Sequence, residues 1–193
     1  VVRWALEECG AAYETVIIEF GEEMKGPDYL AINPMGKVPA IRHGEDVVTE
    51  CAAICAYLAD AFPDAGLLPE AGERAAYFRW LFFAAGPLEQ AVVTKSLEMD
   101  MPADKSMTLG FGTYENTIDT LEGHFNEKTF VCGKRFTMAD VYVGSHIAWG
   151  LSFGTLPKRP SFEAYAERIM SRDANRRART IEDALIAERE AKP

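Results

Sequence analysis

The stretch Asn33–Ile41, which reads N-P-M-G-K-V-P-A-I, decides how the amino-terminal part of this chain folds. Within it, Pro39 follows Val38 in a β-prone run. Proline removes a donor from a strand ladder, so this position is a sheet edge, a bulge or a cis-proline turn. We predict a cis Val38–Pro39 bond that leaves the N–H and C=O of Val38 free to pair with an extended peptide, as an added strand does.

A second stretch, T-E-C-A-A-I at residues 49–54, predicts the start of a helix at Glu50 and Cys51. The first N–H groups of a helix have no intrahelical acceptor and lie at the positive end of its dipole, so they bind carboxylates. A proline at the start of a strand, taken by itself, usually only marks the boundary of the strand and has no function. The two motifs together place a strand edge beside a helix start, and that combination suits a small acidic peptide.

The sequence around these motifs predicts the order α-β-α-β-β-α. The first helix ends at Gly10, a residue that adopts the left-handed stop without steric cost. Residues 13–18 are β-rich and partly alternating, which predicts a strand. The remaining expected elements are a helical turn at 28–32, a hairpin of strands at 38–42 and 46–49, and a helix at 50–61.

Helical periodicity dominates the rest of the chain. Prolines and a glycine mark residues 63–71 as a linker, so we predict one domain over 1–62 and an all-helical domain over 72–193. Thr137 and Asp140 form a variant of the capping box that opens a nearly apolar, buried helix. The expected helices are 72–95 with a bend at Gly86-Pro87, 106–126 with Met107 and Phe111 on its bundle face, 141–151, 161–171 and 174–190.

Composition narrows the classes of function. The net charge of −10 argues against nucleic acid as a partner, because such binding rests on clustered Lys and Arg. No apolar run approaches the length of a membrane span, so we expect no membrane partner. Neither the 3 histidines nor the 4 cysteines show metal-ligand spacing, and we predict no metal. Cysteines without C-x-x-C pairs favour a reduced, cytoplasmic setting.

Nearly the whole chain resembles the cytosolic glutathione transferase family, in particular its bacterial members. The resemblance rests on the two stretches above, on V-R-W-A-L-E-E at Val2–Glu8 and on F-T-M-A-D at Phe136–Asp140. It implies an α/β thioredoxin-like amino-terminal domain with a mixed sheet, followed by an all-α helical bundle. It also implies a homodimer that uses glutathione as co-substrate in detoxification.

The resemblance implies roles for single residues. Val38, before the expected cis-Pro39, would pair its backbone with the cysteinyl part of glutathione. Glu50 and Cys51 would hold the γ-glutamyl end, and Lys37 would neutralise the glycyl carboxylate. Thr137 and Asp140 would serve folding and not catalysis.

The chain departs from the family pattern at two points. Cys51 stands where family members usually have Ser, and a thiol is the weaker hydrogen-bond donor. A cysteine in the first turn of a helix can also react with disulfides. The thiol-activating Ser, Tyr or Cys of the family precedes the first helix, so we expect it upstream of Val1, together with a strand that pairs with 13–18 and 38–42. The catalytic role is therefore assigned to no residue in this chain.

We predict that the protein conjugates the glutathione thiolate to a small hydrophobic electrophile. Tyr77, Trp80 and Trp149 are candidates for the acceptor pocket, although aromatic residues on packed helices are more often core. We expect His146, on the buried helix, to be a hydrogen-bonded core residue. The alternatives are a glutathione-dependent isomerase, dehalogenase or thiol-disulfide reductase on the same fold, and a non-catalytic module that mediates protein assembly.

Overall fold

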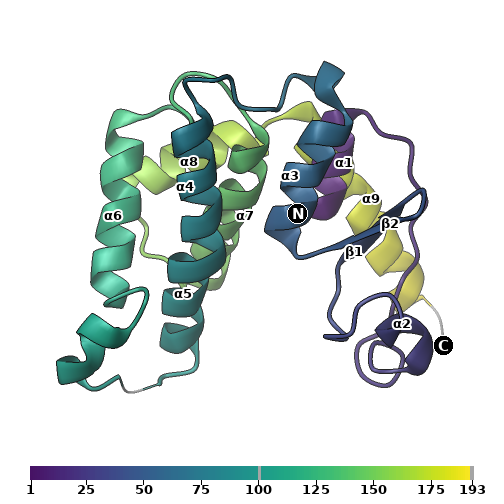
Figure 1. The fold of residues 1–193 in the computed structure, drawn as a ribbon, viewed down its shortest axis with the longest axis horizontal. Helices are drawn as coiled ribbons and strands as arrows, with labels where there is room; N and C mark the ends of the chain where they lie inside the picture. The colour runs from purple at the N-terminus through teal and green to yellow at the C-terminus, as the bar shows by residue number, and fades with distance from the viewer. Residues whose placement is uncertain (100, 192–193) are drawn as a thin grey trace.

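The computed structural model describes residues 1–99 and 101–191. Figure 1 shows α4, α5 and α6 on one side of the molecule and α1, α3, α9 and the small hairpin on the other, with α7 between them. The elements are α1 (Val2–Cys9), α2 (Pro27–Leu30), β1 (Ala40–His43), β2 (Asp46–Thr49), α3 (Cys51–Ala61), α4 (Arg74–Phe83), α5 (Glu89–Ser96), α6 (Tyr114–Glu127), α7 (Met138–Phe153), α8 (Pro160–Met170) and α9 (Asp173–Glu190).

The predicted hairpin is confirmed. Strands β1 and β2 pair antiparallel, with Ala40 opposite Thr49 and His43 opposite Asp46. The two-residue turn between them begins with Gly44 at φ 61°, a left-handed conformation that glycine adopts without steric cost. Pro39 immediately precedes β1, so its missing N–H removes no bond from the ladder.

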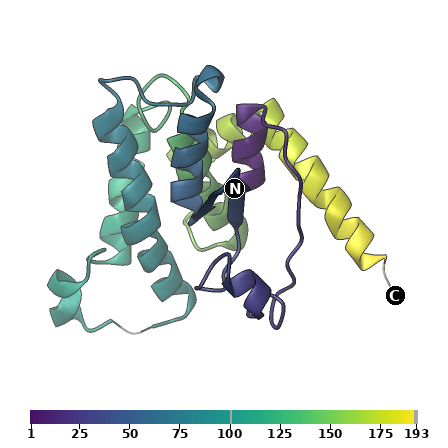
Figure 2. The same cartoon turned by 45° about the vertical axis from the view of Figure 1, so that its right-hand side comes forward.

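The strand predicted at residues 13–18 is wrong for the chain as described. These residues form no regular element, and the one sheet of the described residues contains β1 and β2 alone. The segment descends as a single thread beside α9 (Figure 2), and Val16 is 79% exposed. A β-prone sequence becomes a strand only where another strand lies alongside, because cross-strand pairing and packing against neighbouring strands stabilise it.

The predicted bend at Gly86-Pro87 appears as a π-helical segment, Ala84–Leu88, between α4 and α5. Pro87 has no N–H to give to the helix ladder, and a wider turn accommodates its ring. The insertion changes the direction in which the first side chains of α5 point. Ala84 and Leu88 remain fully buried, so the segment is part of the packed core.

The helix predicted from residue 106 begins later. Residues 103–108 form a 3₁₀ segment, and α6 starts at Tyr114 after the N-cap Thr113, whose hydroxyl accepts from the N–H of Asn116 at 3.1 Å. Gly112, at φ 66°, interrupts the periodic pattern that extended the prediction too far. Met107, expected on the bundle face, is 97% exposed.

Helix α7 is the buried centre of the helical part, as predicted. The capping box of Thr137 and Asp140 is present, and both residues are fully buried. The Asp140 carboxylate accepts from the N–H of Val131 at 2.7 Å, the N–H of Thr137 at 2.8 Å and the hydroxyl of Tyr165 at 2.9 Å. This one carboxylate therefore ties α7 to the preceding loop and to α8.

Ion pairs join α1 to α9, which lie side by side in Figures 1 and 2. Arg172, which precedes α9, donates to both oxygens of Glu8 at 2.6 and 2.8 Å, and its guanidinium lies 3.6 Å from the ring centre of Phe136. Trp4 donates to the same Glu8 carboxylate at 2.8 Å. The Glu8 side chain is only 4% exposed, so Arg172 neutralises a carboxylate that water barely reaches.

We expect Arg172→Ala to lower the free energy of unfolding by about 1–3 kcal/mol, because it leaves the Glu8 carboxylate buried without a counter-charge. The value lies below that of a fully buried pair because Arg172 itself is 35% exposed. Urea denaturation followed by circular dichroism measures the change. The matched control is Arg176→Ala, whose side chain is 61% exposed, and it should stay within about 0.5 kcal/mol of wild type. Equal effects of the two substitutions would contradict the interpretation.

Candidate functional site

The hairpin register brings the two sequence motifs together. Because Ala40 pairs with Thr49, Val38 and Pro39 lie next to Glu50 and Cys51 at the open end of the hairpin. The Val38–Pro39 bond is cis, as predicted. Val38 is 38% exposed, and no hydrogen bond of the described residues involves its main chain. An unpaired, accessible backbone therefore lies beside the first turn of an eleven-residue helix.

Side chains that the sequence analysis missed hold the loop before Val38. The carbonyl of Lys37 accepts from the Tyr29 hydroxyl at 2.8 Å and from Asn33 Nδ2 at 2.7 Å, and both donors are almost completely buried. Lys25 Nζ donates to the carbonyl of Gly36 at 2.9 Å. These bonds fix the backbone that leads into the site. The N-P pair at its start was a turn signal, but it did not indicate which side chains would serve as anchors.

Gly36 is required in this loop for two reasons. Its φ is 55°, in the left-handed region that glycine favours. A Cβ at this position would lie 2.9 Å from the carbonyl oxygen of Met24, a backbone atom that cannot move aside cheaply. The glycine thus allows the loop to pack closely against the turn that carries Lys25.

Glu50 has an unusual backbone for a non-glycine residue, with φ 65° and ψ 116°. Such conformations are costly and cluster at functional sites, where the surrounding structure holds them. The side chain is exposed, and no hydrogen bond or ion pair of the described residues involves its carboxylate. A free negative charge therefore stands directly before the N–H groups of α3. Periodicity could not reveal this conformation.

The thiol of Cys51 is not activated by its position in the first helical turn. Burial raises its pKa, and the charges of Glu50 and Glu89 raise it further. Desolvation of the charged form thus outweighs the favourable end of the helix dipole. Cys9 also has a pKa raised by burial, to about 11, with a smaller contribution from Glu8. For both thiols, burial therefore disfavours the reactive thiolate form.

Lys37 and the acceptor candidates occupy very different environments. Lys37 is exposed next to Val38, free to meet a carboxylate. Tyr77 and Trp80 are only 2% and 3% exposed, so they are part of the core in this structure and offer no surface to an acceptor. Trp149 is 54% exposed and remains the one accessible member of the three.

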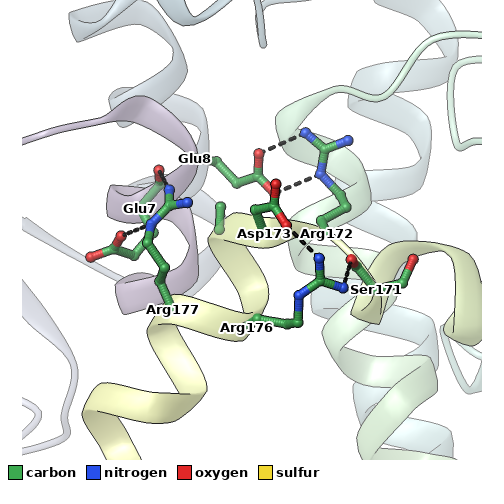
Figure 3. A pocket seen from close by; sticks show the side chains of 8 residues that line it. Glu7, Glu8, Ser171, Arg172, Asp173, Arg176 and Arg177 are labelled. Atoms are coloured by element: carbon green, nitrogen blue, oxygen red, sulfur yellow. Dashed lines mark hydrogen bonds and ion pairs between the residues drawn. The ribbon is translucent and has the colours of Figure 1, made fainter.

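A concavity lies between α1 and the start of α9 (Figure 3). It is lined by three acidic and three basic side chains, and the structure pairs them. Arg172 bonds Glu8, Arg177 bonds Glu7 at 2.8 Å, and Arg176 bonds Asp173. With its charges neutralised in pairs, this surface serves the contact between α1 and α9 and offers no free charge to a ligand.

Within 1–99 and 101–191, no helix combines the length and the apolarity that crossing a membrane demands. Nor do three or more His, Cys, Asp or Glu side chains of that part of the chain gather in a way that could hold a metal ion.

Two protein-family models match the chain. The one described as glutathione S-transferase, N-terminal domain, covers residues 1–61. The one described as glutathione S-transferase, C-terminal domain, covers residues 104–173. Together they include the hairpin, the start of α3 and the capping box of α7.

Individual proteins agree with these matches. The chain is 29% identical over 189 residues to glutathione S-transferase GstA of Escherichia coli O157:H7, covering 95% of this chain and 90% of that protein. It is 31% identical over 157 residues to maleylacetoacetate isomerase of Rattus norvegicus, covering 76% of this chain and 70% of that protein.

Solved structures show the same relationship. A glutathione transferase from Methylococcus capsulatus superposes with a TM-score of 0.77 at 27% identity, over 95% of this chain and 93% of that one. A sphingomonad glutathione S-transferase in complex with glutathione gives 0.74 at 28%, over 94% and 92%. With both family models matched and a relative 31% identical over 76% of the chain, this chain belongs to the glutathione S-transferase family.

Proposed function

We propose that the protein is a glutathione transferase that joins the glutathione thiolate to a small hydrophobic electrophile. The observation that carries the proposal is the unpaired backbone of Val38 beside the start of α3. The N–H and C=O of Val38 can pair with the backbone of a short extended peptide. The N–H groups at the start of α3 can bind the terminal carboxylate of that peptide. Membership of the family supports the same conclusion.

The charges around this backbone match the ends of glutathione. The carboxylate of Glu50 faces the γ-glutamyl ammonium, and the N–H groups of Cys51 and the next residues of α3 receive the γ-glutamyl carboxylate. The ammonium of Lys37 neutralises the glycyl carboxylate. The backbone of Val38 pairs with the cysteinyl residue and so fixes the position of its sulfur. Pro39 closes this edge of the site because it has no N–H to compete for the peptide.

The chemistry needs the sulfur as a thiolate. A hydrogen bond to the charged form lowers the thiol pKa and raises the fraction of nucleophile at neutral pH. The thiolate then forms a carbon–sulfur bond as the electrophile releases its leaving group or accepts a proton. We assign the thiol-activating role to none of the residues of this chain.

Calorimetry with glutathione on the full-length protein tests this function. We expect one site per chain with a dissociation constant below the millimolar range. An absence of binding at millimolar glutathione would favour the alternative of a non-catalytic assembly module. Retention of Lys37, Pro39 and Glu50 counts against that alternative, because protein assembly has no physical need for a peptide-binding edge.

Replacement of Cys51 separates conjugation from thiol-disulfide reduction. We expect Cys51→Ser to tighten glutathione binding about two- to fivefold, because a hydroxyl donates a stronger hydrogen bond than a thiol. Conjugation should persist, since the raised pKa of the Cys51 thiol disfavours the thiolate that a redox step at this residue would need. Cys132→Ser, whose thiol lies 3.5 Å from the Thr137 hydroxyl before α7, is the matched control and should leave the dissociation constant unchanged. Selective loss of reductase activity in Cys51→Ser would instead establish the reductase.

A glutathione-dependent isomerase or dehalogenase is the second candidate within the same chemistry. The relative named maleylacetoacetate isomerase, 31% identical, is the observation that favours an isomerase. Product analysis distinguishes a transferase from an isomerase, because a transferase consumes glutathione stoichiometrically and an isomerase regenerates it. We further propose that the protein acts as a cytoplasmic homodimer in detoxification, with domains over 1–62 and 72–193.

A further inference from the structure

One face of α7 leads away from the proposed glutathione site. Tyr142, His146, Trp149 and Phe153 follow one another at spacings of four, three and four residues, so they share a face of the helix. The exposed fraction rises along this face, from 8% at Tyr142 to 54% at Trp149 and 78% at Phe153. The face is thus buried at one end and open at the other.

The buried end of this face adjoins the start of α3. Helices α3 and α7 pack against each other. Burial raises the pKa of Tyr142, and the nearby carboxylates of Glu89 and Glu50 raise it further. The hydroxyl of Tyr142 therefore lies within electrostatic reach of the residues proposed to hold the γ-glutamyl end of glutathione.

His146 is not the hydrogen-bonded core residue that the sequence suggested. Its side chain is 15% exposed, and its ring stands edge-on to Tyr142 with 4.8 Å between ring centres. The nearest carboxylate oxygen, Oε2 of Glu89, is 3.7 Å from Nδ1, beyond hydrogen-bond distance. No hydrogen bond of the described residues engages either ring nitrogen.

The imidazole of His146 is neutral at physiological pH. Burial lowers its pKa to about 4, so the contact with Glu89 is not an ion pair at pH 7. A neutral imidazole has one N–H donor and one acceptor nitrogen. Because neither ring nitrogen has a hydrogen-bond partner among the described residues, a ligand with a complementary polar group can form a hydrogen bond to this mostly buried ring.

Glu89 adds a negative charge at the edge of the same face. It is the first residue of α5, directly after the π-helical segment Ala84–Leu88, and that widened turn sets its direction. Its side chain is 52% exposed. One exposed carboxylate, that of Glu89, therefore lies beside the His146 ring.

From these contacts, and resting on the proposed function, we propose that His146 is a specificity-determining residue of the acceptor side, which selects uncharged electrophiles that carry a carbonyl oxygen. The imidazole N–H donates to that oxygen, and Trp149 and Phe153 cover the apolar body of the molecule. Glu89 repels anionic electrophiles. An α,β-unsaturated ketone with an aromatic substituent is the matching chemical class.

The reaction with such a ketone balances without a further reagent. The glutathione sulfur forms a bond to the β-carbon, and the electron pair of the C=C bond moves through the carbonyl to its oxygen. The hydrogen bond from His146 stabilises the resulting enolate, which then takes a proton from water at the α-carbon. Donors aimed at developing oxyanion charge are worth more in the transition state than in the ground state.

Kinetics with two probes test the assignment. The measured quantity is the ratio of kcat/KM for 4-phenylbut-3-en-2-one to that for benzyl chloride, which carries no carbonyl oxygen. We expect His146→Leu to lower this ratio about five- to tenfold, the loss of one hydrogen bond, and His146→Gln to restore it to within about twofold. His43→Leu, in the exposed hairpin, is the matched control. An unchanged ratio in His146→Leu, or no rescue by glutamine, would overturn the proposal.

Glu89→Gln tests the charge selection. We expect it to raise kcat/KM for 4-(4-carboxyphenyl)but-3-en-2-one about three- to fivefold relative to the uncharged enone. The difference should shrink as salt is raised, because an exposed charge is screened. An identical response of the charged and uncharged probes would remove Glu89 from the assignment.

A binding measurement keeps this proposal separate from the proposed function. The chain has 3 histidines, so the ¹⁵N resonances of His146 are identified by their loss in His146→Leu. The unreactive 4-phenylbutan-2-one should shift them, and butylbenzene at the same concentration should not. Equal shifts, or none, would refute the role of His146. Failure of glutathione to bind would instead refute the transferase and leave this titration decisive for His146.

Discussion

Asp140→Ala is expected to lower the free energy of unfolding by about 3–5 kcal/mol, the largest effect of any substitution considered for this protein. The carboxylate is fully buried and accepts hydrogen bonds from the backbone of Val131 and Thr137 and from the hydroxyl of Tyr165. Alanine would leave these donors buried without acceptors, and each such group costs about 1–3 kcal/mol. Urea denaturation gives the change directly.

Two variants sharpen this test. Thr137→Ala removes only part of the capping box and should cost about 1–2 kcal/mol. Asp119→Ala, on the exposed side of α6, should change the stability by less than about 0.5 kcal/mol. A loss below 1 kcal/mol in Asp140→Ala would mean that the α7 cap is not the organising contact that its geometry indicates.

The pH dependence of stability gives an independent check on the same carboxylate. Burial raises the pKa of Asp140 to about 6 from its ordinary value of 3.8, although its hydrogen bonds oppose the shift. The folded protein therefore holds this proton more tightly than the unfolded chain, so the contribution of Asp140 to stability falls as pH rises from about 4 to 6. The decrease is about 3 kcal/mol. Asp140→Asn should lack it, and the stability of wild type relative to Asp140→Asn should fall over this range.

Glu50→Gln should weaken glutathione binding about 10- to 100-fold with little effect on stability. The carboxylate has no partner among the described residues, so its loss leaves no broken internal bond. A hydrogen bond to a charged group contributes about 1.5–3 kcal/mol, which corresponds to this range of affinities. Glutamine, like glutamate, is a non-glycine residue, so the substitution leaves the backbone strain at position 50 unchanged. Calorimetry against glutathione at pH 7 measures the effect.

Glu45→Gln supplies the matched control for Glu50→Gln. It lies in the exposed turn of the same hairpin and makes the same change of charge without touching the site. Its dissociation constant for glutathione should stay within about twofold of wild type. A similar weakening in both variants would indicate a general effect of net charge and would remove Glu50 from the binding site.

Local sequence predicted the elements whose causes are local. Gly10 ends α1 in the left-handed conformation, the capping box opens α7, and the cis bond before Pro39 is present. In each case a few adjacent residues contain the whole physical reason. The positions of Lys37, Val38, Glu50 and Cys51 also followed from motifs, because a hairpin with a short turn fixes which residues face one another.

The errors occurred where the cause lies elsewhere in the fold. Residues 13–18 have the composition of a strand, yet a strand needs a neighbour that local sequence does not specify. Tyr77 and Trp80 carry side chains suited equally to a pocket or a core, and only packing places them in the core. The helix predicted over 106–126 began too early, before Gly112. Periodicity measures the spacing of apolar residues and contains no information about backbone conformation.

The sequence by itself determined the family through its motifs. It also determined the hairpin-and-helix frame of the proposed glutathione site and the cap of the central helix, because each of these depends on contacts a few residues long. Only the tertiary structure decided that Cys51 is an unactivated thiol, that Glu50 carries a free carboxylate on a strained backbone and that His146 has both ring nitrogens unengaged. Burial and neighbouring charge set these properties, and both arise when distant segments pack together.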